Sequence, residues 1–191
     1  MKKKIFLIEV VFFSCKINEI CRIITIFAEK LNLFMQELTL NTTIKAMQKE
    51  ELSEPEQLLV EAAIEATKRS YSPYSHFSVG AALLLENGKT VIGCNQENAA
   101  FPAGLCAERT AIFAAGAQYP DVPVTMLAIA ARNSKGELTD EPISPCGTCR
   151  QVMIETETRF KHPIRILLYG RKCIYVLEGI KQLMPLSFTE F

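Results

Sequence analysis

Cys106-Ala107-Glu108-Arg109 is one of two stretches that decide the fold of this chain; the other is Pro145-Cys146-Gly147-Thr148-Cys149-Arg150. Together they offer three thiol ligands and one carboxylate that follows the first thiol by two residues. A catalytic zinc site takes three protein ligands and leaves a fourth position for water. Zinc lowers the pKa of such a water towards neutrality, so that it becomes a usable nucleophile. We therefore predict a hydrolytic zinc enzyme, with Cys106, Cys146 and Cys149 as ligands and Glu108 as the proton carrier.

The residues around the thiols predict a helical turn between Cys146 and Cys149 and a helix that begins at Cys106. Pro145 restricts the backbone before Cys146, and Cys149 follows one helical turn later, so both sulfurs point the same way. Residues 110–118 are rich in alanine and apolar side chains, which favours a buried helix that starts at Cys106. A helix N-terminus lowers the pKa of a thiol there and so eases metal binding. Taken alone, the Cys-x-x-Cys pair also fits a redox motif, or a structural zinc site with Cys94 or Cys173 as fourth ligand.

The composition of the chain limits the size of its core, the kinds of partner it can bind and the compartment in which it can work. A chain of 191 residues is long enough for one domain with a substantial core. Its 21 basic and 21 acidic residues balance, which argues against a nucleic-acid partner because such a partner normally requires a basic face. Thiolate ligands must stay reduced, so the metal interpretation of the seven cysteines implies a cytoplasmic protein.

The N-terminal stretch fits the rest poorly. Lys2-Lys3-Lys4 before Ile5 to Ile8 is how a signal peptide begins, but Glu9 interrupts the apolar run. No run of about 20 apolar residues is present, so we expect no membrane span. We interpret residues 1–50 as an extension, with Met35 as a plausible true start, and residues 51–191 as the domain. The alternative is an arm or a helix that packs on the domain.

Hydrophobic patterns divide the domain into alternating elements. Ser53-Glu54-Pro55-Glu56 is a capping box that starts a helix extending to about Arg69. Asn87-Gly88 is a hairpin turn between two apolar strands. We expect strands at 78–85, 90–94, 124–131, 164–169 and 173–176, and a final helix at 177–184. This order fits an α/β sandwich.

With their flanking residues, the two motifs closely resemble the small cytidine deaminases of nucleoside salvage, over residues 58–188. Zinc deaminases of nucleobases carry a His or Cys, then x-Glu, then Pro-Cys-x-x-Cys, with the Glu as general acid and base. Because the first ligand is Cys106, the chain resembles the three-cysteine members. The resemblance implies a three-layer α/β/α sandwich with a mixed five-stranded sheet and helices on both faces. It also implies one Zn²⁺ per subunit and a homotetramer whose active sites are shared between subunits.

The resemblance also implies substrate contacts, each of which has a plainer interpretation. Phe77 would pack against the bound nucleoside, although its loop could simply cap the core. Asn95 and Glu97 would bind the ribose, although Asn95-Gln96-Glu97-Asn98 could be only a polar loop. Arg109 would donate to the ligand sulfurs and offset their excess negative charge, or it could extend to solvent. Further contacts would come from the backbone near Ala107 and Ser144, which would hold the base edge, and from Phe188, which would close the active site, often that of a neighbouring subunit.

The function implied is hydrolysis of cytidine and deoxycytidine to uridine and deoxyuridine, with Glu108 moving the protons. Three alternatives remain. A deaminase of another nucleobase or aminonucleoside shares the metal motif, but an enzyme for free bases has no need of Asn95 and Glu97. A polynucleotide-editing deaminase needs a basic channel. A non-catalytic zinc module would hold its metal with four protein ligands and would leave Glu108 unexplained.

Overall fold

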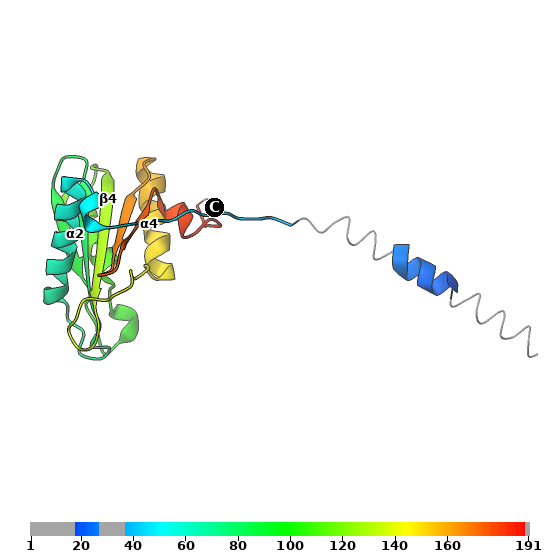
Figure 1. Cartoon of the computed structure of the whole chain (residues 1–191), viewed down its shortest axis with the longest axis horizontal. Helices are drawn as coiled ribbons and strands as arrows, with labels where there is room; N and C mark the ends of the chain where they lie inside the picture. Colours follow the sequence, from blue (N-terminus) through cyan, green and yellow to red (C-terminus); the bar gives the residue numbers. More distant parts are fainter. Residues whose placement is uncertain (1–17, 27–36, 190–191) are drawn as a thin grey trace, which may run out of the picture. The chain divides into compact units, whose positions relative to one another are not determined.

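The computed structural model describes residues 18–26 and 37–189, in two compact units, Met1–Asn41 and Thr42–Phe191. In the first unit, residues 18–26 form a helix whose side chains are exposed. The signal-like start of the chain and Met35 lie outside the described residues. Within 18–26 and 37–189, no helix has both the length and the apolar composition of a membrane span. The second unit is made of layers of helices and strands (Figure 1).

The second unit is built on a mixed sheet with the strand order β1-β6-β5-β4-β2-β3. Among the strands of the described residues, β4 and β5 run parallel and the other neighbouring pairs are antiparallel. The strands are β1 (Lys45–Met47), β2 (Ser78–Leu85), β3 (Thr90–Cys94), β4 (Val124–Arg132), β5 (Arg165–Tyr169) and β6 (Ile174–Leu177). The helices are α2 (Glu54–Ala66), α3 (Ala107–Gln118) and α4 (Gly147–Phe160), with short 3-10 turns η1 (Lys49–Glu51), η2 (Thr67–Arg69), η3 (Phe101–Ala103) and η4 (Ile180–Gln182).

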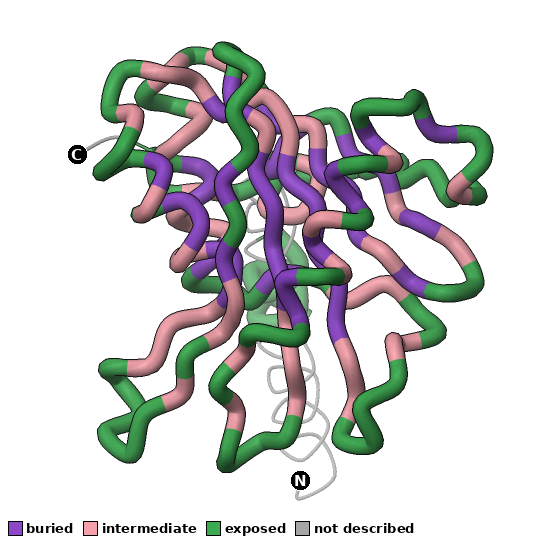
Figure 2. Tube along the Cα trace, turned by 90° about the vertical axis from the view of Figure 1, so that its left-hand side faces the viewer, coloured by how far each residue is buried: buried purple, intermediate pink, exposed green. Residues whose placement is uncertain are grey.

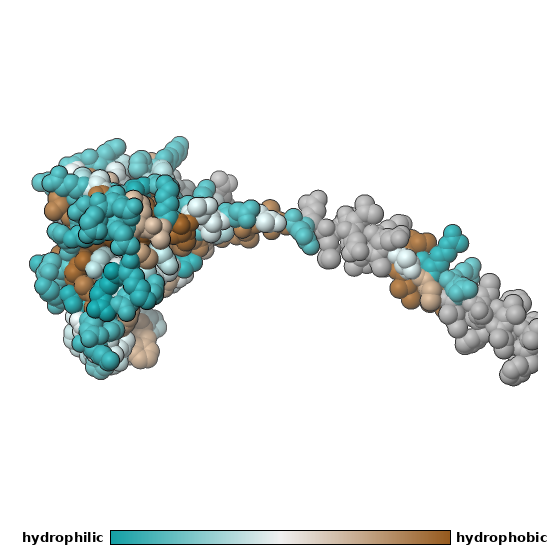
Figure 3. Space-filling view, in the orientation of Figure 1, coloured by the Kyte–Doolittle hydropathy of each residue, from teal (hydrophilic) through white to brown (hydrophobic). Residues whose placement is uncertain are grey.

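Helices cover both faces of this sheet, which confirms the predicted three-layer sandwich. On one face α2 packs through Leu59, Val60 and Ala63 against β2, β4 and β5. On the other face α3 and α4 pack through residues such as Ala111 and Met153. Figure 1 shows α2 and α4 on opposite sides of β4, and Figure 2 shows the buried residues concentrated along the central strands. The outer face seen in Figure 3 is mostly hydrophilic, with smaller hydrophobic patches.

Two glycines allow the helices to approach the sheet closely. A Cβ on Gly80 of β2 would lie 2.1 Å from the carbonyl oxygen of Ala63 in α2. A Cβ on Gly93 of β3 would lie 2.4 Å from the carbonyl oxygen of Ala107, the first residue of α3. Real Cβ atoms essentially never come this close, so only glycine fits at either position. Gly93 therefore sets how near the N-terminus of α3 lies to the sheet.

The predicted elements agree with the structure except near the two ends of the domain. The capping box forms, because the Ser53 amide donates to the Glu56 carboxylate at 2.8 Å. The sheet of the described residues has six strands and not five, because β1 pairs with the otherwise open edge of β6. That added strand lies within residues 1–50, ahead of the first helix of the domain.

The predicted final helix over 177–184 is wrong. Leu177 is the last residue of β6 and pairs with Ile166 of β5. Gly179 then adopts a φ of 144°, which a helix does not allow. Only the three-residue turn η4 comes next, and Pro185 is close behind it. The helix-like spacing of apolar residues here reflects a strand end and a short turn.

Candidate active site

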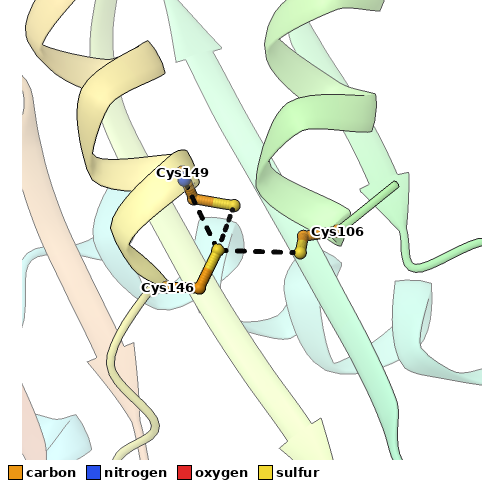
Figure 4. A group of neighbouring side chains, drawn as sticks. All are labelled: Cys106, Cys146 and Cys149. Atoms are coloured by element: carbon orange, nitrogen blue, oxygen red, sulfur yellow. Dashed lines mark hydrogen bonds between the residues drawn. The ribbon is translucent and has the colours of Figure 1, made fainter. Parts of the chain in front are cut away.

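The N-termini of α3 and α4 place three thiols side by side. Cys106 is the residue before α3 and Cys146 the residue before α4, while Cys149 lies in the first turn of α4. Figure 4 shows the three sulfurs facing one another between the two helix starts. Both helices begin at an extended residue, with ψ values of 156° at Cys106 and 165° at Cys146. Free amides and the positive end of each helix dipole thus favour negatively charged sulfur at this point.

The spacing of the sulfurs suits a single tetrahedral metal ion. The Cys106 and Cys146 sulfurs are 3.8 Å apart, those of Cys146 and Cys149 are 3.3 Å apart, and all three lie within 4.8 Å of one another. Sulfurs at about 2.3 Å from a tetrahedral zinc ion lie about 3.8 Å from one another. Within the described residues, the group that gathers here has these three ligands and no fourth. Neither of the two candidate fourth ligands belongs to this group: Cys94 donates instead to the carbonyl of Arg69 at 3.2 Å, and Cys173 directly precedes β6.

The thiols differ in their readiness to ionise. Hydrogen bonds from Cys149, and also from Arg109 and Cys146, lower the pKa of the Cys106 thiol to about 5. Conversely, the bond to Cys106 raises the pKa of Cys149, which is fully buried. One thiolate, that of Cys106, is thus favoured even before a metal binds, whereas Cys149 would need a bound cation to ionise. Soft, negatively charged sulfur of this kind is the preferred donor for zinc.

Glu108 provides a buried carboxylate close to the three thiols. It lies in the first turn of α3, is 4% exposed, and lines the same cavity as Cys106 and Cys146. Burial raises the pKa of its carboxyl group, and the neighbouring Cys106 adds to the effect. A carboxyl group with a raised pKa can hold and release a proton nearer to neutral pH, as a general acid and base requires.

Arg109 lies beside the first thiol. Its Nη2 is 3.9 Å from the Cys106 sulfur and donates to the carbonyl of Gly104 at 3.3 Å. The side chain is only partly buried, although its Nε atom is buried without a hydrogen-bond partner among the described residues. The guanidinium group is thus turned towards the thiols. An Arg109 side chain that merely extends to solvent would not explain this orientation.

A cavity of about 710 Å³ opens in front of the thiols and Glu108. Pockets for small organic ligands commonly measure about 300–1,000 Å³. Apolar atoms dominate its wall, to which the 74–77 loop and residues Asn95 to Asn98 add polar groups. The predicted substrate residues Phe77, Asn95 and Glu97 therefore share one cavity with Cys106 and Cys146. Other lining residues that bear on function are Tyr74, Ser75, Phe101, Arg109, Ile129 and Ser144.

Asn95 and Glu97 are held by the loop before β2 and by the start of that strand. Asn95 Oδ1 accepts from the amide of Val79 at 2.7 Å, and its Nδ2 donates to the carbonyl of Phe77 at 2.9 Å. Glu97 Oε2 accepts from the amides of Tyr74 and Ser75 at 2.9 and 3.2 Å. Each side chain is therefore fixed before any ligand binds.

Two other residues predicted to take part in the site, Ala107 and Phe188, are not among those that line the cavity. Ala107 is fully buried at the start of α3, next to Glu108. Phe188 is 63% exposed, and its carbonyl accepts from Gln151 of α4 at 2.8 Å. It does not line the cavity of its own chain.

Tyr74 and Ser75 were not predicted from the sequence, yet they line the cavity and bond to Glu97. In this aromatic loop only Phe77 was predicted to contact a ligand. The only signal was the turn-forming Ser-Pro-Tyr-Ser run. That run does not reveal its partner, because the pairing of Tyr71 with residues 95–97 arises in the fold. Tyr74 also packs edge-on against Phe101, with ring centroids 5.9 Å apart.

Comparison with known proteins shows that this chain is similar to cytidine deaminases. The family model described as "Cytidine and deoxycytidylate deaminase zinc-binding region" matches residues 53–161. A cytidine deaminase of Halalkalibacterium halodurans is 46% identical over 99 residues, which cover 52% of this chain and 70% of the relative. One of Mycobacterium tuberculosis is 38% identical over 106 residues, covering 54% and 74%. The crystal structure of cytidine deaminase from Burkholderia pseudomallei superposes with a TM-score of 0.61 at 38% identity, covering 72% of this chain and all of that one.

Proposed function

Because the chain belongs to the cytidine and deoxycytidylate deaminase family, we propose that it hydrolyses cytidine and deoxycytidine to uridine and deoxyuridine, with release of ammonia. One observation carries the proposal: the buried carboxylate of Glu108 lines a cavity large enough for a nucleoside, together with two of the three clustered thiols. A structural zinc site has no need of such a carboxylate, and it closes the metal with a fourth protein ligand.

The thiols and Glu108 would divide the chemistry between them. Zn²⁺ held by Cys106, Cys146 and Cys149 would, when bound, supply the Lewis acidity that activates water as a nucleophile. Glu108 takes a proton from the attacking water and gives it to the ring nitrogen beside the amino-bearing carbon. The water oxygen bonds to that carbon. Glu108 then carries the remaining hydroxyl proton to the amino group, which leaves as ammonia while the carbonyl of the product forms.

The rest of the cavity would bind the nucleoside. We assign sugar recognition to Asn95 and Glu97, because a carboxylate accepts from a hydroxyl group and an amide both donates and accepts. Phe77 would pack against the nucleoside, and backbone groups near Ala107 and Ser144 would hold the base edge. Arg109 would offset the charge of three thiolates around a divalent ion. A deaminase of free bases is less well supported, since it has no use for Asn95 and Glu97 in the cavity.

We also propose that the protein acts in the cytoplasm as a homotetramer with one Zn²⁺ per subunit. Reduced thiolates favour a reducing compartment. Phe188 does not line its own cavity, and Leu58, Phe113 and Leu186 are large apolar side chains that are exposed in the single chain. Burial between subunits would remove this apolar surface from water. Residues 51–191 would form the catalytic domain, with residues 1–50 as an extension whose strand β1 joins the sheet. Light scattering and zinc analysis would test the subunit number and the metal content.

The reaction is tested by ammonia release from cytidine and deoxycytidine with zinc-loaded protein, beside Glu108→Gln. We expect the variant to lose turnover by about 10²- to 10⁴-fold or more, the contribution of a general acid and base. Its zinc content should stay normal, because Glu108 is not a ligand. Glu155→Gln is the matched control, since Glu155 is an exposed carboxylate on α4 that does not line this cavity. Near-normal turnover by Glu108→Gln would overturn the assignment.

A further inference from the structure

Ser75 makes three hydrogen bonds that join two of the proposed substrate residues. Its hydroxyl donates to Oε1 of Glu97, and its amide donates to Oε2 at 3.2 Å. The same hydroxyl oxygen accepts from the amide of Phe77 at 3.1 Å. Ser75 is therefore a direct link between the sugar-binding carboxylate and the residue that would contact the nucleoside.

The loop that carries Ser75 is anchored at both ends to the strand end that carries Glu97. At its start, the amide of Tyr71 donates to Asn95 at 3.0 Å, and the amide of Glu97 donates to Tyr71 at 2.8 Å. At its end, the side chain of Asn95 bonds to Phe77 and Val79. Between these anchors, Tyr74 and Ser75 in the middle of the loop donate hydrogen bonds to the Glu97 carboxylate. The middle of the loop thus depends on the carboxylate, and the carboxylate depends on the loop.

The backbone between Ser75 and Phe77 is unusual. His76 has a φ of 54°, in the left-handed region that residues other than glycine adopt at some cost. Its amide donates to the carbonyl of Ser72 at 3.0 Å. The turn at His76 brings the amide of Phe77 back to the Ser75 hydroxyl. The bonds around Ser75 therefore hold a conformation that the sequence would not adopt freely.

These bonds also decide which part of Glu97 is free to meet a ligand. A carboxylate has about four acceptor positions on its two oxygens. Tyr74 and Ser75 occupy both positions on Oε2, and the Ser75 hydroxyl occupies one on Oε1. One position on Oε1 is left for a sugar hydroxyl. Without the Ser75 hydroxyl, the Glu97 side chain would regain rotamers that binding must then remove.

We propose, on the basis of the deamination function above, that Ser75 is the positioning residue for sugar recognition: it fixes Glu97 with one acceptor site facing the nucleoside. Ser75 acts through Glu97 and takes no part in proton transfer. Its contribution therefore appears in the binding of nucleosides that carry a secondary sugar hydroxyl, and not in the chemical step.

The test compares cytidine with 2′,3′-dideoxycytidine, which keeps the base but lacks both secondary hydroxyls. In Ser75→Ala we expect the KM for cytidine to rise about tenfold, as the loss of one hydrogen bond to a charged group allows. The kcat should change by less than about twofold, because an interaction equally strong in ground and transition states affects only KM. The inhibition constant of the dideoxy analogue should stay within about twofold of its wild-type value, because it has no hydroxyl for Glu97 to read.

Two controls separate this role from general damage to the loop. Ser72→Ala removes another hydroxyl group from the same loop. Among the described residues this hydroxyl bonds only to Ser70 and Ser78, so the variant should leave the KM for cytidine and the inhibition constant of the dideoxy analogue unchanged. In a Glu97→Ala background, Ser75→Ala should cause no further rise in KM, because a residue that acts through another is not additive with it. Thermal unfolding of each variant checks that the loop change has not unfolded the domain.

The outcomes are distinct. If Ser75→Ala weakens cytidine and the dideoxy analogue equally, or if its effect adds to that of Glu97→Ala, Ser75 does not position the sugar-binding carboxylate and the inference fails while the proposed function stands. If the wild-type protein releases no ammonia from cytidine, the proposed function fails and the inference fails with it.

Discussion

Replacing Gly93 with alanine tests whether the packing of α3 on the sheet sets the metal site. The added Cβ would lie 2.4 Å from the carbonyl oxygen of Ala107, 2.5 Å from the amide nitrogen of Ala111 and 2.9 Å from the Cβ of Ala111. Ordinary contact begins at 3.4 Å, so the nearest atom is about 1 Å too close. All three atoms belong to the helix framework and cannot rotate away. The N-terminus of α3 must therefore move outward, and with it Cys106 and Glu108.

We expect Gly93→Ala to lower the free energy of unfolding by about 3 kcal/mol, the upper part of the usual range for overpacking. At a urea dependence of about 2 kcal/mol per molar, the unfolding midpoint would fall by about 1.5 M. Bound zinc per chain should fall as well, because a shift of about 1 Å in Cys106 spoils a site whose distances are fixed to about 0.2 Å. Midpoints must be compared at equal protein and zinc concentrations, since binding stabilises the folded state.

Gly116→Ala is the matched control, because it makes the same change in α3 itself. A Cβ at Gly116 meets nothing within 4 Å, so alanine there should raise the free energy of unfolding by about 0.4–1 kcal/mol through its better helix propensity. If Gly93→Ala proves as stable as Gly116→Ala and binds zinc normally, the close contact between β3 and α3 does not control the site.

Two further predictions concern charged side chains. The carboxylate of Glu56 is buried, which opposes its ionisation, yet bonds from Ser53 and Arg165 outweigh burial and lower its pKa from the ordinary 4.5. The stabilising effect of the Glu56 carboxylate is therefore complete above the pKa of the unfolded state and is lost as the pH falls through the pKa of the folded state. The free energy of unfolding should accordingly fall less steeply with pH below about pH 4 in Glu56→Gln than in the wild type. An identical dependence on pH in the two proteins would contradict this. For Arg109→Gln we expect activity or zinc affinity to fall by about 10- to 100-fold, as is common when a group that bonds to a metal ligand is removed. Turnover and zinc retention against a chelator measure this, and wild-type values would show that Arg109 is turned to solvent.

The order and type of most elements arise from local physical chemistry. The capping box at Ser53 and the turn at Asn87-Gly88 need only neighbouring residues, and the structure has a helix and a hairpin at these places. The predicted final helix failed because a strand end before Gly179 has helix-like apolar spacing, and only pairing with β5 decides between the two. Strand β1 could not be predicted, since the strand with which it pairs among the described residues is the distant β6.

The sequence by itself determined the chemical groups: three thiols and a carboxylate at spacings that suit zinc, beside two helix starts. The tertiary structure alone decided how they meet. Close packing at Gly93 sets the N-terminus of α3, and the pairing of the 71–77 loop with residues 95–97 brings Ser75 to Glu97. Residue types and short spacings are local properties of a chain, whereas contacts between segments far apart in sequence depend on which surfaces pack and which backbone groups remain to be paired.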